Sequence, residues 1–293
     1  MKRGPASICQ FILTQLDVSA DPSPVLEIIV KATIVLGWHS TRDEAYDDAE
    51  RWKDAVLQRL RDELDGLNRA GRFSVFTFNS ALPDHVQGSA FIEPHDAEDV
   101  KDAKRRRGHF AAYGQFLQQI SPREFEALCS GILKELGVLD PVLTQSSVDE
   151  GIDFYGKLPV GSKLLPNAVF PGIQSQMAIW MVGQAKHYVK GQVSTPDVRE
   201  LVGSVVLARS RAFSVNRNKY ADLLIRACDP VFFLFFSTGR ISSQGWSLLE
   251  AAGVIGMDGP MVAAMLADFR VCTDGNNEFS EEMFSRWISG FLN

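Results

Sequence analysis

The chain has 293 residues, a formal net charge of -6 and 45% hydrophobic residues, which suits one large soluble domain or two smaller ones. The acidic balance argues against a protein that holds nucleic acid through bulk positive charge, because phosphate binding depends on clustered Lys and Arg. No apolar run reaches the roughly 18 residues of a membrane span. We therefore expect a cytoplasmic protein with no membrane contact.

The cysteines lie far apart in the sequence, without Cys-x-x-Cys or Cys/His spacing; they are Cys9, Cys129, Cys228 and Cys272. This spacing indicates neither a zinc site nor a disulfide framework. We expect reduced, buried thiols.

Residues 1–100 are predicted to form a small α+β domain. Ile8–Leu16 and Val25–Leu36 are rich in Ile, Val, Phe and Leu and predict strands, although the second run is continuous enough to be ambiguous. Ser74–Phe78 alternates as a strand does, and Ser89–Ile92 is a further strand candidate.

A long helix is predicted between these strands. It begins at a capping-box pattern from Thr41 to Glu44, continues with apolar residues every three or four positions, and ends at Gly71. The resulting order of strand, strand, helix and strand differs from the helix-rich pattern of a winged-helix or helix-turn-helix reader. The role of this domain, in recognition or in regulation, is left open.

Residues 101–120 are predicted to be a charged linker and helix. The stretch from Asp96 to Gly108 has no periodic apolar face and ends in a basic run of Lys104, Arg105, Arg106 and Arg107. The favoured interpretation is the solvated start of a helix. The alternative is a strap whose Arg105, Arg106 and Arg107 side chains bind DNA phosphates.

Residues 121–293 alternate between helical and strand patterns, which is typical of an α/β unit. The first helix begins at Ser121-Pro122-Arg123-Glu124, where an N-cap, a proline and a capping-box glutamate coincide. Further elements are predicted at the apolar run 178–182, a helix capped near Thr195, a buried strand Val231–Phe236, and helices near 243–252, 261–269 and 281–292.

Polar residues follow the apolar run 178–182, and they are the candidate catalytic residues of this strand. Gln184 and Lys186 point to one side of a strand, because side chains alternate between its faces. Asp153 lies roughly thirty residues earlier, behind Gly151, at the end of a short extended segment. Hydrolysis of a phosphodiester uses a divalent cation and a group that assists the attacking water.

We therefore interpret this end of the sheet as a split metal site. Mg²⁺ takes oxygen ligands, usually with only one or two carboxylates. Asp153 is the first predicted ligand, and the amide of Gln184 and the backbone carbonyl of Ala185 are further donors. Lys186 can orient water or stabilise charge on the phosphate. Glu126 borders the apolar face of the first helix and can reach the sheet, as a ligand or as a partner of one.

Four segments in this order resemble the Mrr-like catalytic domain of restriction endonucleases, in the PD-(D/E)xK superfamily, in the variant with Gln in place of the second acid. They are Phe125–Leu128, Asp149–Asp153, Gln184–Tyr188 and Val198–Gly203, with weaker similarity at Phe235–Gly239. The resemblance covers about residues 115 to 270. It implies a mixed central sheet flanked by helices, and a DNA endonuclease that acts in restriction or antiviral defence with Mg²⁺, or alternatively Mn²⁺.

By the same resemblance Asp153, Gln184, Lys186 and Glu126 are the catalytic residues. Glu150 departs from the second Gly of many relatives, and the insertion 157–175 lengthens the connection between the two motif strands. The winged-helix domain of the founding members is not indicated before the nuclease unit. Target recognition therefore does not carry over.

Several residues near the motifs keep two interpretations. His187 and Tyr188 are read as packing or surface residues, with substrate contact by Tyr188 as the alternative, and Asp149 as a turn residue or a ligand. Positive charge also gathers after residue 198, and its candidate DNA-binding residues are Arg209, Arg211, Arg217 and Lys219. A solvated face explains this stretch equally well.

At the level of the whole protein, the alternative to an endonuclease is a binding or scaffold subunit of a defence complex with weak or conditional cleavage. A homodimer or a defence-system partner protein is expected, because a double-strand break usually needs two active sites.

Overall fold

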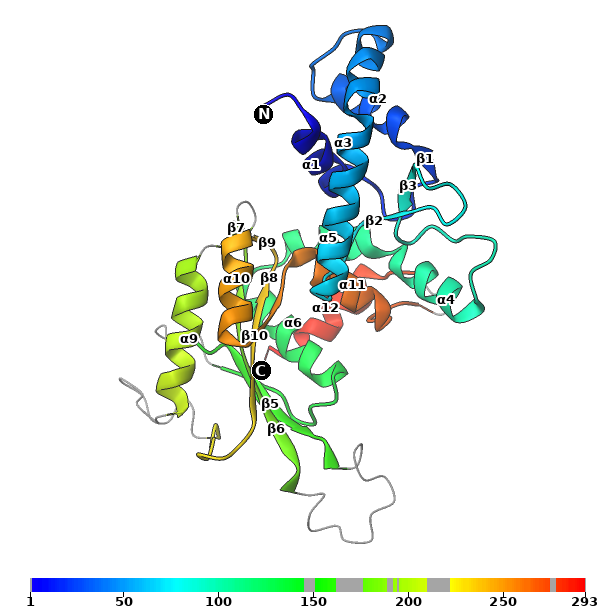
Figure 1. Ribbon diagram of the computed structural model, residues 1–293. Coiled ribbons are helices and arrows are strands. Elements are labelled where there is room, and N and C mark those ends of the chain that lie inside the picture. Colours follow the sequence, from blue (N-terminus) through cyan, green and yellow to red (C-terminus); the bar gives the residue numbers. More distant parts are fainter. Residues whose placement is uncertain are drawn as a thin grey trace. The chain divides into compact units, whose positions relative to one another are not determined.

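The computed structural model describes residues 2–144, 151–161, 176–188, 192–193, 195–209, 222–274 and 278–292. The chain divides into two compact units, Met1–Ala111 and Ala112–Asn293. Figure 1 labels the elements of both. Within the described ranges, no helix combines the length and the apolar composition needed to cross a bilayer.

The first unit begins with three helices: α1 (Pro5–Gln15), α2 (Val25–Val35) and α3 (Arg42–Arg69). The predicted strands Ile8–Leu16 and Val25–Leu36 are therefore wrong. Helix α2 is largely buried, and a helix in such a place has little polar period that would distinguish it from a strand. Helix α1 exposes Gln10 and Thr14 at helical spacing, a signal that the strand assignment overlooked. The length of both segments was the better indicator, because eleven residues exceed an ordinary strand, and Pro5 stands at a favoured helix start.

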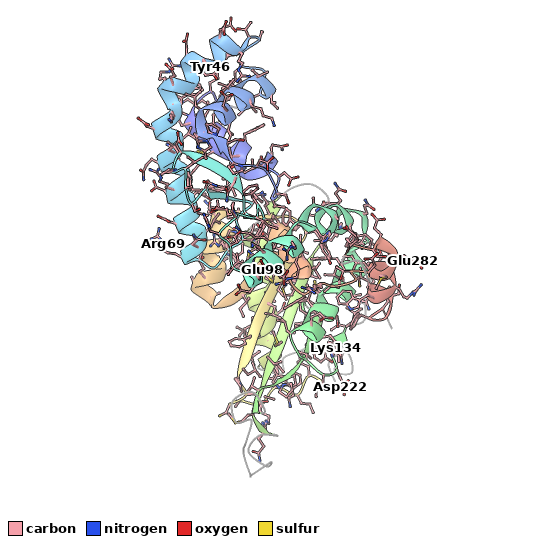
Figure 2. All side chains as sticks on the ribbon, turned by 90° about the vertical axis from the view of Figure 1, so that its right-hand side faces the viewer. Tyr46, Arg69, Glu98, Lys134, Asp222 and Glu282 are labelled. Carbon is pink, nitrogen blue, oxygen red and sulfur yellow. The ribbon has the colours of Figure 1, made fainter. Side chains whose placement is uncertain are left out.

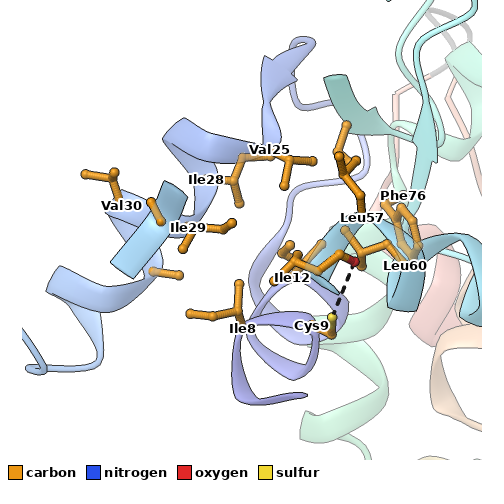
Figure 3. Packing of buried hydrophobic residues seen from close by; sticks show 14 of the residues in the cluster. Ile8, Cys9, Ile12, Val25, Ile28, Ile29, Val30, Leu57, Leu60 and Phe76 are labelled. Carbon is orange, nitrogen blue, oxygen red and sulfur yellow. Dashed lines mark hydrogen bonds between the residues drawn. The ribbon is translucent and has the colours of Figure 1, made fainter. Parts of the chain in front are cut away.

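These helices share one apolar core, shown in Figure 3. Ile8 and Ile12 of α1 pack with Ile29 of α2 and with Leu60 of α3. The Cys9 sulfur lies 3.9 Å from the Val56 carbonyl oxygen. Helix α3 begins as predicted, with the Thr41 side chain accepting from the Glu44 backbone N–H.

A small antiparallel sheet completes the unit, in the order β1–β3–β2. Its strands are β1 (Ser23–Pro24), β2 (Phe76–Phe78) and β3 (His85–Gly88). The strand predicted at Ser74–Phe78 is confirmed, whereas Ser89–Ile92 follows β3 and forms no strand. The unit is rich in helices, so the predicted order of strand, strand, helix and strand is wrong and does not exclude a helix-rich nucleic-acid reader.

The charged stretch forms helix α4 (Glu98–Arg107), in which no residue is buried. The predicted helix without a buried apolar face is thus confirmed, and DNA binding by its arginines stays a prediction. Glu98, 74% exposed, marks its start in Figure 2. Helix α5 (Phe110–Gln119) follows.

The second unit contains a five-stranded mixed sheet in the order β10–β8–β6–β5–β4. Strands β10, β8 and β6 run parallel, and β5 pairs antiparallel with both β6 and β4. The strands are β4 (Val142–Leu143), β5 (Phe154–Pro159), β6 (Ala178–Lys186), β8 (Val231–Ser237) and β10 (Val254–Met257). The mixed central sheet expected from the sequence is confirmed, and β10 was not predicted.

Helices cover both faces of this sheet, with α6 (Pro122–Glu135) on one and α9 (Thr195–Arg209) on the other (Figure 1). The predicted capping box of α6 is present, since Ser121 and Glu124 each accept from the other's backbone N–H. Phe125 and Leu128 of α6 are fully buried. On the other face, Val198 and Leu201 of α9 pack against Phe235 of β8.

The remaining elements lie around this sandwich. A parallel pair is formed by β7 (Gln192–Val193) and β9 (Arg240–Ile241). Helix α10 (Ser243–Ala252) packs beside α9, and the chain continues through α11 (Gly259–Asp268) and α12 (Glu281–Ser289). The three late helices predicted from the sequence are confirmed.

All four cysteines are free thiols. Cys9 and Cys129 are buried as expected, whereas Cys228 is exposed and Cys272 is partly buried. The expectation of burial is therefore wrong for Cys228, which lies in a turn before β8.

Candidate functional site

The site lies where β6 ends beside the beginning of β5. Asp153 immediately precedes β5, and its backbone N–H donates to the Gly183 carbonyl over 2.9 Å. Its carboxylate oxygen Oδ2 accepts from the backbone N–H of Ala185 over 2.7 Å. The antiparallel register therefore places the acid next to the Gln184–Lys186 segment, although about thirty residues separate them in the sequence.

Gly151 makes the approach to this acid possible. Its φ of +70° lies in the left-handed region that favours glycine. A Cβ atom there would lie 2.2 Å from the Ser204 Oγ of α9 and 3.6 Å from Gln184 Nε2. The chain thus passes closely between the end of β6 and helix α9, with no room for a side chain.

Gln184 and Lys186 point to the same side of β6 and meet one carboxylate, that of Glu200 on α9. Lys186 Nζ donates to Glu200 Oε2 over 3.1 Å, and Gln184 Nε2 lies 3.5 Å from Glu200 Oε1. Gln184 is only 2% exposed, and its Oε1 atom has no hydrogen-bond partner in the part of the chain that the structure describes. A buried acceptor without a partner is costly, which indicates a site for a missing ligand.

Glu126 approaches from the α6 side and is engaged by arginine. Arg123 Nη1 donates to Glu126 Oε2 and to the Thr144 carbonyl, each over 2.7 Å. Thr144 in turn donates through its backbone N–H to the Asp153 carbonyl over 2.9 Å. Glu126 is thus linked to Asp153 through Arg123 and Thr144.

The pKa of the buried Cys129 thiol on α6 is affected by the carboxylates of Asp153 and Glu126. Burial raises the pKa of Cys129 well above its usual value, and the negative charges of Asp153 and Glu126 raise it further. The charges of Asp153 and Glu126 thus both affect the Cys129 thiol.

The residues that follow Lys186 are held by packing and backbone contacts. The His187 ring makes an edge contact with Phe125 at 6.0 Å between centroids, and its Nε2 lies 3.2 Å from the Leu117 carbonyl. The Tyr188 backbone N–H donates to Thr238 Oγ1 over 2.8 Å. Burial raises the pKa of Tyr188 to about 12, with contributions from a hydrogen bond to Asp197 and from the charges of Asp197 and Glu200. These contacts agree with the packing interpretation.

The candidate DNA-binding residues are only partly described. Arg105 pairs with Asp102 and Glu98, and Lys104 pairs with Asp96, so acids of the same segment offset part of the basic run. Arg106 is partly buried, and Arg107 has an interaction partner. The Arg209 side chain and residues Asp149, Arg211, Arg217 and Lys219 lie outside the described part of the chain.

The oxygen donors near Asp153 fit a hard divalent cation. No group of three or more His, Cys, Asp or Glu side chains suited to a metal occurs among the described residues, so a metal would not be enclosed by carboxylates alone. Mg²⁺ usually takes one or two carboxylates and keeps several waters. The Asp153 carboxylate and the unpartnered Gln184 Oε1 are donors of this type.

Glu200 was missed as a site residue by the sequence reasoning. It lies inside the segment Val198–Gly203 that carried part of the resemblance. Its helical position was predictable, but no local pattern indicated that α9 would point this carboxylate at the end of β6.

Comparison with protein families decides the identity of this part of the chain. Residues 117–220 match the family Mrr_cat, described as restriction endonuclease. This segment is therefore similar to the catalytic domain of Mrr-like restriction endonucleases. The match covers less than half of the chain, includes Asp153, Gln184, Lys186 and Glu200, and confirms the resemblance on which the sequence analysis relied.

Three restriction endonucleases are among the solved structures to which the chain is similar. They include MspJI in complex with a 27-mer oligonucleotide (19% identity, TM-score 0.38, 67% of this chain and 37% of that chain) and the DNA modification-dependent AspBHI (19%, 0.39, 62% and 39%). FokI bound to DNA covers 97% of this chain and 46% of its own at 11% identity and a TM-score of 0.30. The chain thus spans less than half the length of these proteins. No curated protein matches the chain in a sequence comparison.

Proposed function

We propose that the chain is a metal-dependent DNA endonuclease that hydrolyses phosphodiester bonds in restriction or antiviral defence. The observation that carries the proposal is the meeting of Asp153, Gln184 and Lys186 at one end of the sheet, within a part of the chain that matches restriction endonucleases. Mg²⁺ is the proposed metal, with Mn²⁺ as a substitute.

Each residue has a distinct role in this proposal. The Asp153 carboxylate, the Gln184 carbonyl oxygen and the backbone carbonyl of Ala185 would hold the cation, which would supply polarisation of the phosphate and activation of water. The Lys186 ammonium donates to the attacking water or to the phosphate oxygen that gains charge. Glu126 is the carboxylate of the α6 side, kept in place by Arg123.

Gly151 and the hydrogen bond from the Ala185 N–H keep the candidate site residues in position. The bond fixes one Asp153 oxygen, Oδ2, and so orients the carboxylate. The close passage at Gly151 keeps α9 near the end of β6. Fixed orientation matters because small displacements of reacting groups reduce rates strongly.

A plasmid-nicking assay with Mg²⁺ or Mn²⁺ tests the proposal. We expect the Asp153→Ala and Lys186→Ala variants to cleave at least about 100-fold more slowly than wild type, as for removal of a group that stabilises the transition state. Lys134→Ala is the matched control, because Lys134 is an exposed lysine of α6 (Figure 2) and should leave the rate unchanged. Equal rates in wild type, Asp153→Ala and Lys186→Ala would contradict the proposal.

A DNA-binding or scaffold subunit of a defence complex is the second candidate. The net charge of -6 and the acid partners of Arg105 favour it, because they limit the positive surface available to DNA. The same assay with a gel-shift measurement separates the two. DNA binding without cleavage under all metal conditions would support the scaffold.

A further inference from the structure

Glu200 contacts both polar side chains that end β6. Its two carboxylate oxygens face different groups, Oε1 the Gln184 amide at 3.5 Å and Oε2 the Lys186 ammonium at 3.1 Å. The Glu200 side chain is 43% exposed, so its carboxylate stands at the solvent boundary of an otherwise buried strand end. It is therefore accessible to an ion that enters from solvent.

The Gln184 amide provides an independent sign of a ligand. Its Oε1 atom is buried and has no partner within the described residues, while its Nε2 atom faces Glu200. An amide oxygen is a good ligand for a hard cation. Because amide oxygen and nitrogen occupy nearly the same shape, an amide rotation can present the oxygen toward Glu200 without other movement.

The end of β6 carries the positive charge of Lys186 and no carboxylate of its own, so a second acidic ligand would have to come from another element. A neutral amide occupies position 184, so β6 contributes no carboxylate beside Lys186. On the α6 side, Glu126 is already paired with Arg123 at 2.7 Å. Glu200 touches the Gln184 and Lys186 side chains directly.

We propose that Glu200 is the second acidic ligand of the divalent-cation site, acting from α9 with the Gln184 carbonyl oxygen and with Asp153. The assignment rests on the proposed metal-dependent function. Without a cation, the Lys186 ammonium balances the Glu200 charge. With a cation, Glu200 exchanges this partner for the ion, and the Lys186 ammonium becomes available to water or phosphate.

Calorimetric titration with Mn²⁺, in the absence of DNA, tests the assignment without relying on activity. Wild type is compared with Glu200→Gln, with the double variant Gln184→Glu/Glu200→Gln, and with Asp153→Ala. We expect Glu200→Gln to weaken Mn²⁺ binding by about 10-fold or more, as for loss of groups that support a metal. The double variant returns a carboxylate to the strand and should recover affinity to within about 3-fold of wild type.

Two controls make the result specific. Glu282→Gln removes a similar carboxylate, paired with Arg286 at 2.9 Å on α12 and 83% exposed, and should bind Mn²⁺ as wild type does (Figure 2). Asp153→Ala should lose the same binding event, which places the measured ion at this site. Circular dichroism spectra should be identical for all variants.

Unchanged Mn²⁺ affinity in Glu200→Gln would overturn the assignment and leave Glu200 as an ion-pair partner of Lys186. Weakened binding that the double variant does not recover would overturn it as well. Absence of Mn²⁺ binding in wild type would instead remove the metal dependence of the proposed function, and the assignment with it. The result for Glu200→Gln and the result for wild type thus distinguish the two failures.

Discussion

The backbone N–H of Ala185 donates a 2.7 Å hydrogen bond to the carboxylate of Asp153, so a strand amide orients the acid of the candidate site. The Asp153 carboxylate therefore has two separable properties. One of its oxygens accepts the hydrogen bond that joins Asp153 to β6, and the group carries a negative charge. Asparagine retains the first and lacks the second. Alanine lacks both.

Asp153→Asn should therefore cleave plasmid DNA at least about 100-fold more slowly while the fold is kept. Asp153→Ala should in addition lower the free energy of unfolding by about 1 kcal/mol, because the Ala185 N–H loses its acceptor. Nicking rates and urea denaturation measure the two effects. Wild-type nicking by Asp153→Asn would show that the charge is not needed.

Gly151→Ala should damage the site through the backbone. The residue has φ +70°, and a Cβ would lie 2.2 Å from Ser204 Oγ. A left-handed conformation alone costs an ordinary residue roughly 1–2 kcal/mol. We expect the free energy of unfolding to fall by at least that amount, with a parallel loss of nicking.

Gly203→Ala is the matched control for this change. Gly203 lies on α9, and a Cβ there meets nothing within 4 Å. Alanine should raise stability by up to about 1 kcal/mol, because glycine is a poor helix residue. If both variants unfold at the same denaturant concentration, the close passage at Gly151 has no energetic role.

Asp229 should make the stability of the protein sensitive to acid. Its buried carboxylate accepts from Arg226 through Nε and the backbone N–H, at 2.9 and 3.0 Å, and from Trp180 Nε1 at 3.2 Å. Hydrogen bonds from Arg226 lower the pKa of Asp229 from 3.8 to about 2. A depressed pKa means that the ionised form stabilises the fold above about pH 3.8, and that this contribution is lost as the pH falls through about 2.

Asp229→Asn should accordingly reduce the free energy of unfolding by roughly 1–2 kcal/mol at neutral pH. The difference from wild type should shrink between about pH 4 and pH 2. Denaturant titrations at several pH values measure it. Asp222→Asn changes an exposed carboxylate (Figure 2) and should show no such convergence. A difference independent of pH would contradict the ionic contribution.

Cys228 should be the thiol that reacts rapidly with Ellman's reagent in the native protein, because its side chain is exposed. Burial raises the pKa of Cys9 and that of Cys272 to about 11, and raises the pKa of Cys129 well above its usual value, which disfavours the reactive thiolate in all three. All four thiols should react after denaturation. Cys228→Ser should abolish the fast phase, and its persistence would indicate that another thiol is accessible.

The nuclease part of the fold was readable from the sequence because its signals are local. The capping box at Ser121 and Glu124 starts α6, and the apolar run before Gln184 is a central strand. Alternation along that strand put Gln184 and Lys186 on one face, as observed. Strand β10 was missed because four residues between two helices carry little periodicity.

Two failures have different physical origins. Segments α1 and α2 are apolar enough to be strands or helices, and their length of eleven residues, which favours a helix, was given too little weight. The contact of Glu200 with Lys186 depends on where α9 lies over the sheet. That contact is not encoded in the spacing of residues along one segment.

The register of β5 and β6 places the candidate site at one end of the strand pair and the connection between the two strands at the other end. Phe154 pairs with Gly183 beside Asp153, whereas Pro159 pairs with Ala178 at the other end. At ~3.3 Å per residue, the two ends of β5 lie about 17 Å apart. The inserted connection therefore begins far from the candidate site, and an epitope tag or spectroscopic label introduced beyond Pro159 would leave the Asp153 end of β5 undisturbed.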